Sequence, residues 1–184
     1  IAIRQQRAEL SEFKREELSL KICNQAKQTH FYLQATRIAL YLANQGEVET
    51  RNLIEHALSS DKQVYLPVLD SSDKTRMYFV RYQAGDHLVE NRFGLLEPEL
   101  KEENVIEAKQ LDLVLCPLVA FDEDAHRVGM GGGFYDRALS NFIKTRKKRL
   151  WGVAHDFQET LIQPQPWDIA LDGVFSNKRV ITAR

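Results

Sequence analysis

The sequence contains few of the residues and segments that mark several large classes of protein. Cys23 and Cys116 are its only cysteines, and both stand in apolar surroundings far from one another. This pattern predicts reduced thiols in a cytoplasmic protein rather than a disulfide framework. The five histidines have no zinc-ligand spacing. No apolar run approaches the length of a membrane span, and neither a signal peptide nor an internal repeat is visible.

Excess charge of either sign is absent as well. The formal net charge is −1 and the pI is about 6.6, so neither nucleic acid nor an anionic membrane is expected as a partner. With 184 residues, 43% hydrophobic and 28% charged, the chain is predicted to be a single domain over residues 1–184. It would have a helical segment at about 1–33 and an α/β core at about 36–184. The chain begins with Ile1 rather than Met, so we expect a trimmed or disordered N-terminus, and we expect a monomer.

The most informative stretch consists of a strand, a glycine-rich loop and a helix. Leu111–Val119 is a short apolar run, as in a strand buried on both faces. Residues 121–133 form a loop, and residues 134–142 have the apolar spacing of a helix. This order favours phosphate binding, because loop N–H groups and a helix N-terminus attract anions. Arg127 would add a positive charge at the loop entrance, and Asp136 is a carboxylate that could hold magnesium against phosphates.

The spacing of the glycines leaves the function of this loop open. Gly129, Gly131, Gly132 and Gly133 follow a G-x-G-G-G pattern, which is neither the dinucleotide fingerprint nor a Walker loop. Glycine clusters also form plain tight turns. On spacing alone, a phosphate cradle and a structural turn both remain possible.

The residue types in and around this loop are more informative than the spacing of its glycines. The segment PLVAFDEDAHRVGMGGGFYDRAL resembles the signature of the 5-formyltetrahydrofolate cyclo-ligases, also called methenyltetrahydrofolate synthetases. The fixed positions of that signature are met by Pro117, Phe121, Asp122, Arg127, Gly129, Gly131, Gly133, Phe134, Tyr135 and Asp136.

This resemblance implies a set of ligands and of residues that contact them. It implies ATP as co-substrate, bound by Arg4, Arg127, Val128, Gly129, Met130, Gly131, Gly132, Gly133, Phe134, Tyr135 and Arg137. It implies folate contacts from Leu42, Glu47, Phe93, Met130, Gly131, Gly132, Gly133 and Phe134. Mg²⁺ would be held by Asp136 and Asp172, with Asp168 as the alternative to Asp172.

Several of these residues could instead have a purely structural role and bind no ligand. Arg4 and its neighbour Arg7 would be solvated helix charges, and Glu47 a surface acid favoured by a helix N-terminus. Phe93 would be a core residue, and Asp172 an acid in a turn. The sequence also departs from the family at Met130 and Gly132, where some relatives carry Arg and Lys, and the family's N-terminal Lys would precede Ile1.

The remaining segments predict an α/β sandwich. Apolar runs predict strands at residues 37–43, 63–69, 76–82, 150–155 and 173–176. The first thirty residues favour one long helix or two helices broken near Ser11, and Thr50 is expected to cap a helix that buries Leu53, Ile54, Ala57 and Leu58. Residues 88–100 are turn-like, a helix and a Pro-bounded loop are expected after residue 155, and residues 144–149 would end a helix with solvated cations. The resemblance implies a three-layer α/β/α fold with a mostly parallel sheet, of the CoA-transferase and sugar-phosphate isomerase type.

A cyclo-ligase converts 5-formyltetrahydrofolate and ATP to 5,10-methenyltetrahydrofolate, ADP and phosphate. The sequence has no Ser-His-Asp or Cys-His set, and such a phosphoryl transfer does not require one. A polyglutamate tail on the folate could use the basic residues 144–149. The alternative function is a sugar-phosphate-binding sensor or isomerase of similar fold.

Overall fold

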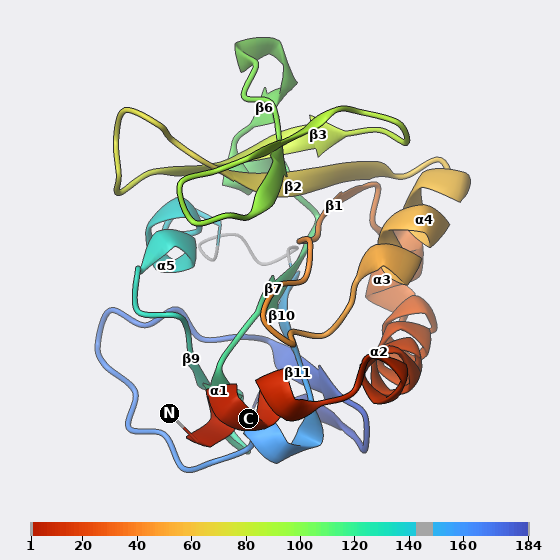
Figure 1. Ribbon diagram of the computed structural model, residues 1–184, viewed down its shortest axis with the longest axis vertical. Coiled ribbons are helices and arrows are strands. Elements are labelled where there is room, and N and C mark those ends of the chain that lie inside the picture. Colours follow the sequence, from red (N-terminus) through yellow and green to blue (C-terminus); the bar gives the residue numbers. More distant parts are fainter. Residues whose placement is uncertain (1, 143–148, 184) are drawn as a thin grey trace.

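A large central sheet organises the protein. The structure is a computed structural model that describes residues 2–142 and 149–183. Eight strands of these residues form the sheet in the order β12-β11-β10-β7-β1-β2-β3-β6 (Figure 1). Their bounds are β1 Arg37–Ala39, β2 Gln63–Leu69, β3 Met77–Tyr82, β6 Val105–Ile106, β7 Leu113–Pro117, β10 Arg149–Ala154, β11 Gly173–Ser176 and β12 Val180–Thr182.

The five middle strands run parallel, and the strands on either side are antiparallel. β11, β10, β7, β1 and β2 pair in parallel, whereas β12, β3 and β6 are antiparallel to their neighbours. β7 is central and buried from Leu113 to Cys116, which accounts for its continuous apolar sequence. A mostly parallel sheet flanked by helices confirms the predicted α/β class.

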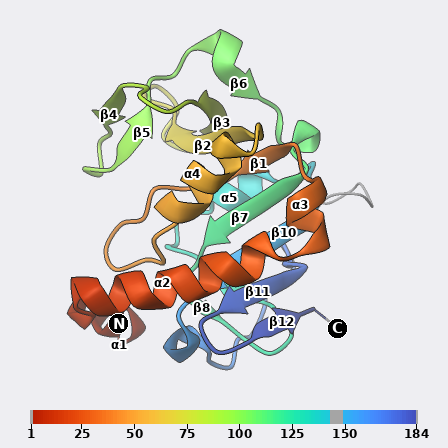
Figure 2. The same cartoon turned by 90° about the vertical axis from the view of Figure 1, so that its right-hand side faces the viewer.

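Helices cover both faces of the sheet. α2 (Glu12–Lys27), α3 (His30–Gln34) and α4 (Arg51–Ser59) lie together on one face (Figures 1 and 2). α5 (Phe134–Ala138) lies on the opposite face, and α1 (Ala2–Glu9) lies near the lower end of the sheet in Figure 1. Single 3-10 turns occur at Glu102–Asn104, Ala108–Gln110 and Asp156–Gln158. No helix within residues 2–142 or 149–183 is long and apolar enough to cross a bilayer.

The N-terminal helices follow one of the two predicted alternatives. The helix breaks at Ser11, whose hydroxyl accepts the N–H of Lys14 at 3.3 Å and caps α2. Residues 2–9 form α1. Thr50 stands at the N-cap of α4, but its hydroxyl donates to the carbonyl of Tyr41 instead. The predicted side-chain cap is therefore wrong, although Leu53, Ile54 and Ala57 are buried as expected.

Several predicted elements are shorter or differently folded. β1 ends at Ala39 although the buried chain continues, and α5 ends at Ala138 because residues 139–142 form turns. Residues 88–100 contain a hairpin of β4 (Leu88–Glu90) and β5 (Leu96–Pro98). The helix expected after β10 is a single 3-10 turn, and β12 was not predicted. Of the basic segment 144–149, only Arg149 lies within the described residues, and it begins β10.

Candidate functional site

Two loops converge where the order of strands in the sheet reverses. From β1 the chain passes to β2 on one side, and from β7 it passes to β10 on the other. The carboxyl ends of β1 and β7 therefore flank the switch point at which open α/β sheets bind ligands. The loop after β1 carries Glu47, and the segment after β7 carries residues 129–133, hereafter the glycine loop.

A small hairpin presents the glycine loop. β8 (Ala120–Phe121) pairs with β9 (Arg127–Val128), so the predicted irregular loop begins as a two-stranded ribbon. Gly133 then takes a left-handed φ of 62° as the N-cap of α5, a conformation that glycine adopts without steric cost. Because α5 has only five residues, anion binding at this loop would rely on the loop N–H groups more than on a helix dipole.

Arg127 and Asp136 form an ion pair beneath the glycine loop. Nη2 of Arg127 donates to Oδ1 of Asp136 at 2.5 Å, and Arg127 is only 7% exposed. The same Oδ1 accepts the N–H of Ile169 at 3.3 Å. The sequence interpretation treated Arg127 as a charge on a loop outside the core, and its burial corrects that view.

Two further arginines reach the glycine loop. Arg4 of α1 donates through Nη2 to the carbonyl of Met130 at 3.5 Å. Arg137 of α5 donates to the carbonyls of Gly132 at 2.7 Å and of Thr75 at 2.9 Å. The structure therefore brings Arg4, Arg127 and Arg137 to one loop from three separate elements.

Arg7 explains how α1 is held beside the site. It is 1% exposed, so its interpretation as a solvated helix charge is wrong. Nη1 of Arg7 donates to the carbonyl of Leu118 at 3.2 Å, just beyond β7. Gly46 has a φ of 76°, and a Cβ there would lie 2.3 Å from the carbonyl oxygen of Arg7. Only glycine permits this close approach, which fixes the loop that carries Glu47.

Glu47 is a partly buried carboxylate on the wall of a cavity. Its Oε2 accepts the N–H of Asn44 at 3.0 Å. Burial raises the pKa of Glu47, and this effect exceeds the opposing contributions of the Asn44 hydrogen bond and of Arg7. A carboxylate in such a place is costly without a ligand that supplies donors or positive charge.

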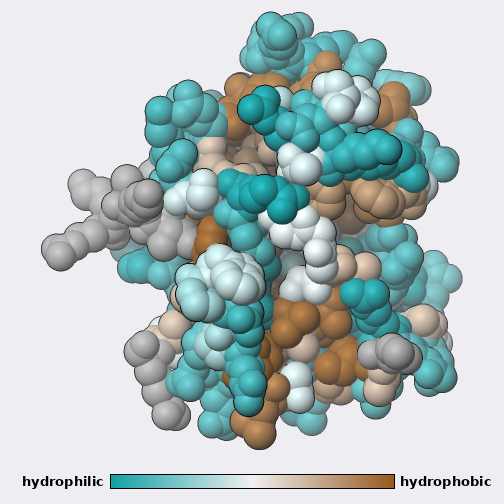
Figure 3. Space-filling model, turned by 90° about the vertical axis from the view of Figure 1, so that its left-hand side faces the viewer, coloured by the Kyte–Doolittle hydropathy of each residue, from teal (hydrophilic) through white to brown (hydrophobic). Residues whose placement is uncertain are grey.

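The cavity beside Glu47 is mainly apolar. Its volume is about 490 Å³, and its walls include Leu42, Leu66, Met77, Phe93, Phe134 and Tyr135. Figure 3 shows hydrophobic residues, in brown, exposed among hydrophilic ones on the side of the molecule that carries α5. Phe93 lies at the tip of the β4–β5 hairpin and is 58% exposed, so its interpretation as a core residue is wrong.

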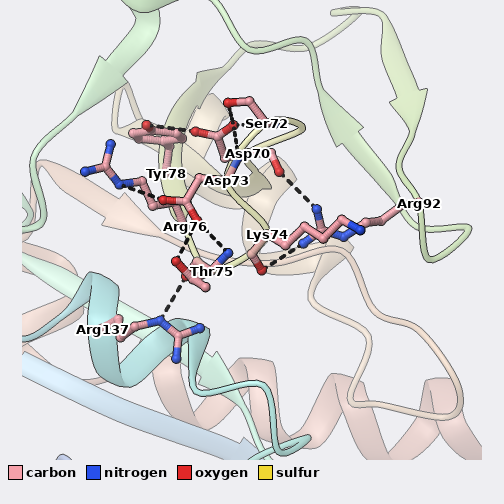
Figure 4. A network of polar contacts seen from close by, with 9 residues as sticks. All are labelled: Asp70, Ser72, Asp73, Lys74, Thr75, Arg76, Tyr78, Arg92 and Arg137. Atoms are coloured by element: carbon pink, nitrogen blue, oxygen red, sulfur yellow. Dashed lines mark hydrogen bonds and ion pairs between the residues drawn. The ribbon is translucent and has the colours of Figure 1, made fainter.

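The turn between β2 and β3 ties the hairpin and the glycine loop together. Arg92 donates to the carbonyls of Asp70 at 3.1 Å and of Lys74 at 3.0 Å, while Arg137 donates to the carbonyl of Thr75 (Figure 4). The guanidinium of Arg92 also lies 5.1 Å from the ring centroid of Phe93. These contacts hold the hairpin tip at a fixed place relative to the glycine loop.

A second cavity of about 720 Å³ lies on the other side of the glycine loop. It is bordered by Arg127, Asp136, Arg137, Trp167 and Asp168, among others. Trp167 is 72% exposed, and the sequence interpretation did not single it out. An aromatic face is thus available beside a polar cavity.

The three candidate metal carboxylates differ in position. Asp136 and Asp168 border the second cavity. Asp172 accepts the N–H of Leu150 at 2.7 Å and lies 3.7 Å from the guanidinium of Arg149, at the amino end of β10. Among residues 2–142 and 149–183, no three His, Cys, Asp or Glu side chains are grouped to hold a metal. A nucleotide-bound Mg²⁺ needs only one or two carboxylates besides phosphate oxygens, and Asp136 and Asp168 fit that requirement.

A histidine beneath the Glu47 loop is buried in its neutral form. His155 is fully buried, its Nε2 lies 3.3 Å from the carbonyl of Gly46, and its ring stacks on Phe157. Burial lowers the pKa of His155 from 6.5 to about 4, with Arg7 acting in the same direction. Between these values the unfolded chain binds a proton that the folded protein does not.

We therefore expect His155 to make the protein less stable as the pH falls from about 6.5 to about 4. Because of His155 alone, the free energy of unfolding should be about 2 kcal/mol lower at pH 5 than at pH 7.5. Urea unfolding at both pH values should show a smaller difference for His155→Gln than for the unaltered protein. The exposed His87, replaced by Gln, serves as the control. An unchanged pH difference in His155→Gln would contradict the prediction.

Comparison with known proteins gives one consistent result. The family model described as "5-formyltetrahydrofolate cyclo-ligase family" matches residues 2–177. The curated 5-formyltetrahydrofolate cyclo-ligases of Haemophilus influenzae and Escherichia coli K12 are each 37% identical to the chain. The matches cover 92% of this chain and 90% of the first relative, and 97% of this chain and 98% of the second.

Solved structures agree with the sequence matches. The 5,10-methenyltetrahydrofolate synthetase of Aquifex aeolicus has a TM-score of 0.84 and 29% identity, covering 100% of this chain and 90% of that one. The synthetase of Mycoplasma pneumoniae has a TM-score of 0.74 and 28% identity, covering 95% and 93%.

Proposed function

The chain belongs to the 5-formyltetrahydrofolate cyclo-ligase family, and we propose that its two cavities divide the family's substrates between them. The reaction is the ATP-dependent cyclisation of 5-formyltetrahydrofolate to 5,10-methenyltetrahydrofolate. The apolar cavity would take the pteridine, against Leu42 and Phe93. The second cavity would take the nucleotide, with its phosphates on the glycine loop.

The observation that carries this arrangement is the wall that the two cavities share. Arg127, Gly129, Gly132, Gly133 and Asp136 border both of them. A γ-phosphate on this wall would therefore face a formyl group in the apolar cavity. Holding the two reacting groups at one place converts a bimolecular step into an effectively unimolecular one.

The chemistry suits the side chains at this wall. The formyl oxygen attacks the γ-phosphorus and ADP leaves. The 10-nitrogen then attacks the activated formyl carbon and loses its proton, and phosphate departs with the former formyl oxygen. An amide oxygen carries no proton, so the first step needs no general base. Arg127 and the glycine-loop N–H groups would neutralise charge on the transferring phosphoryl group, which is the main requirement of such a transfer.

Magnesium would supply further positive charge at the phosphates. We assign it to Asp136, whose hydrogen bonds to residues 2–142 and 149–183 both fall on Oδ1, with Asp168 as the second carboxylate because it borders the same cavity. The role of Asp172 stays a prediction from the resemblance. Arg4 and Arg137 would offset the missing cations at Met130 and Gly132. A Cβ at Gly132 would lie 2.6 Å from the Phe134 ring, so this loop is shaped for glycine there.

The decisive test of this function is formation of the methenyl chromophore. The protein is mixed with 5-formyltetrahydrofolate, ATP and Mg²⁺, and the absorbance of 5,10-methenyltetrahydrofolate is followed. Omission of ATP is the control. Absence of the chromophore under all conditions would overturn the proposal. The proposal also includes a monomeric state, which light scattering measures. Comparing folates of different tail length tests whether a polyglutamate tail contributes to binding.

We expect ATP to bind more tightly when Mg²⁺ is present, because Asp136 would hold the ion beside the phosphate groups and the ion would supply positive charge there. Calorimetry with and without Mg²⁺ measures the difference, which should disappear in Asp136→Asn. Parallel titrations of Asp168→Asn and Asp172→Asn identify the second carboxylate. Equal affinity for a simple sugar phosphate in the absence of metal would instead favour the alternative function, a sugar-phosphate sensor or isomerase.

A further inference from the structure

A carboxylate other than Glu47 and Asp136 lies on the wall of the apolar cavity. Glu97 of β5 is only 6% exposed, and it borders the cavity together with Leu66, Leu95 and Met77. Burying a carboxylate among apolar side chains is costly unless donors or a cation compensate for lost hydration. The partners of Glu97 therefore indicate what the cavity is built to accept.

The protein satisfies only one of the two oxygens of Glu97. Oε2 accepts the N–H of Leu69 at 3.2 Å and the side-chain amide of Asn91 at 2.7 Å. Within residues 2–142 and 149–183, no donor reaches Oε1 and no cationic side chain pairs with the carboxylate. An ionised carboxylate has about four acceptor positions. Two of them, both on Oε1, are left for a ligand.

The glycine loop, Glu47 and Glu97 border one cavity. Gly129, Gly132 and Gly133 line its wall together with the two carboxylates. Glu97 also bonds to the end of β2 through Leu69. A ligand in this cavity can therefore contact the glycine loop and Glu97 at once.

We propose that Glu97 recognises the pyrimidine edge of the pteridine, where the 2-amino group and the ring N3–H present two adjacent donors. This inference rests on the proposed function, because it takes the occupant of the apolar cavity to be a reduced folate. The 2-amino group would donate to Oε1, which no donor within the described residues reaches. The formyl-bearing end of the ring system is then directed toward Glu47 and the glycine loop. Asn91 is a positioning residue that holds the carboxylate in place.

Glu97 also braces the hairpin that carries Phe93, because its two protein donors come from β2 and from Asn91 near the hairpin tip. A loss of folate binding in a Glu97 variant is therefore not sufficient evidence of direct recognition. The test must compare ligands as well as variants. A folate that lacks the 2-amino group removes a donor and leaves the protein untouched.

The experiment measures the dissociation constants of 5-formyltetrahydrofolate and of its 2-deamino analogue by calorimetry. The unaltered protein should bind the analogue about 10- to 100-fold more weakly, the range for one charge-assisted hydrogen bond. Glu97→Gln should bind 5-formyltetrahydrofolate more weakly by a similar factor and discriminate between the two ligands less than about 3-fold. Glu90→Gln, an exposed acid on β4 of the same hairpin, should behave as the unaltered protein does.

Two results would overturn the inference while leaving the proposed function intact. One is equal binding of both folates by the unaltered protein, a comparison that needs no variant to fold. The other is a Glu97→Gln protein that binds both folates more weakly but keeps the full discrimination between them. That result would show that Glu97 only stabilises the hairpin. A protein that binds neither folate and forms no methenyl chromophore would overturn the proposed function together with the inference.

Discussion

Replacing Arg127 by Ala is expected to lower ATP-dependent turnover roughly 10- to 100-fold, as the loss of a charge-assisted contact to phosphate costs about 1.5–3 kcal/mol. Unlike an exposed loop cation, Arg127 is also expected to matter for folding. Its removal leaves Asp136 without its ion-pair partner in a partly buried place, where the stability loss should be about 1–3 kcal/mol. Turnover, ATP affinity and urea unfolding should be measured on the same preparation.

The double variant Arg127→Ala with Asp136→Asn separates the two effects. It removes the uncompensated carboxylate, so it should regain part of the stability lost in Arg127→Ala, while turnover stays low. Arg81→Ala removes an exposed cation from β3 and should change neither property. If Arg127→Ala turned over normally, the assignment of Arg127 to the phosphates would be wrong.

Glu47→Gln is expected to lower turnover at least ~10-fold while ATP affinity stays nearly unchanged. Positive charge develops near the 5-nitrogen as the ring closes, and a fixed carboxylate stabilises that charge in the transition state more than in the ground state. Gln keeps the shape of Glu47 and can still accept the N–H of Asn44. A loss confined to the chemical step should lower the turnover number and the specificity constant together.

Glu49→Gln is the matched control for this substitution. Glu49 lies two residues away and caps the N–H of Arg51, and it does not border the apolar cavity described above. Its replacement should leave turnover unaltered. Normal turnover in Glu47→Gln combined with weaker ATP binding would place Glu47 at the nucleotide, contrary to the proposed arrangement.

Local sequence patterns predicted the strands that are buried inside the parallel sheet. β2 and β11 begin and end where their apolar runs do, because strands inside a parallel sheet are buried on both faces. The position of a loop directly after a strand was also informative. The segments after β1 and β7 carry Glu47 and the glycine loop, and both segments start at the switch point.

Burial of charged side chains was not predictable, because it depends on partners distant in sequence. The buried Arg7 donates a hydrogen bond to the carbonyl of Leu118. The buried Glu97 accepts hydrogen bonds from Leu69 and Asn91. Glu97 stands in an acid-rich segment, LEPEL, that gives no local sign of burial. Phe93 shows the opposite case, since an apolar residue was expected inside and lies exposed at a hairpin tip.

The contact between Arg7 and Leu118 constrains the order in which the chain folds. These residues are separated by 111 positions, so α1 leaves the ribosome long before its anchoring carbonyl is synthesised. β1 likewise waits for β7, since Ile38 pairs with Leu113. Contacts of such separation form slowly, because loop closure must precede them. Until residues 113–118 emerge, the nascent chain exposes an unpaired edge of β1 that can pair with other chains.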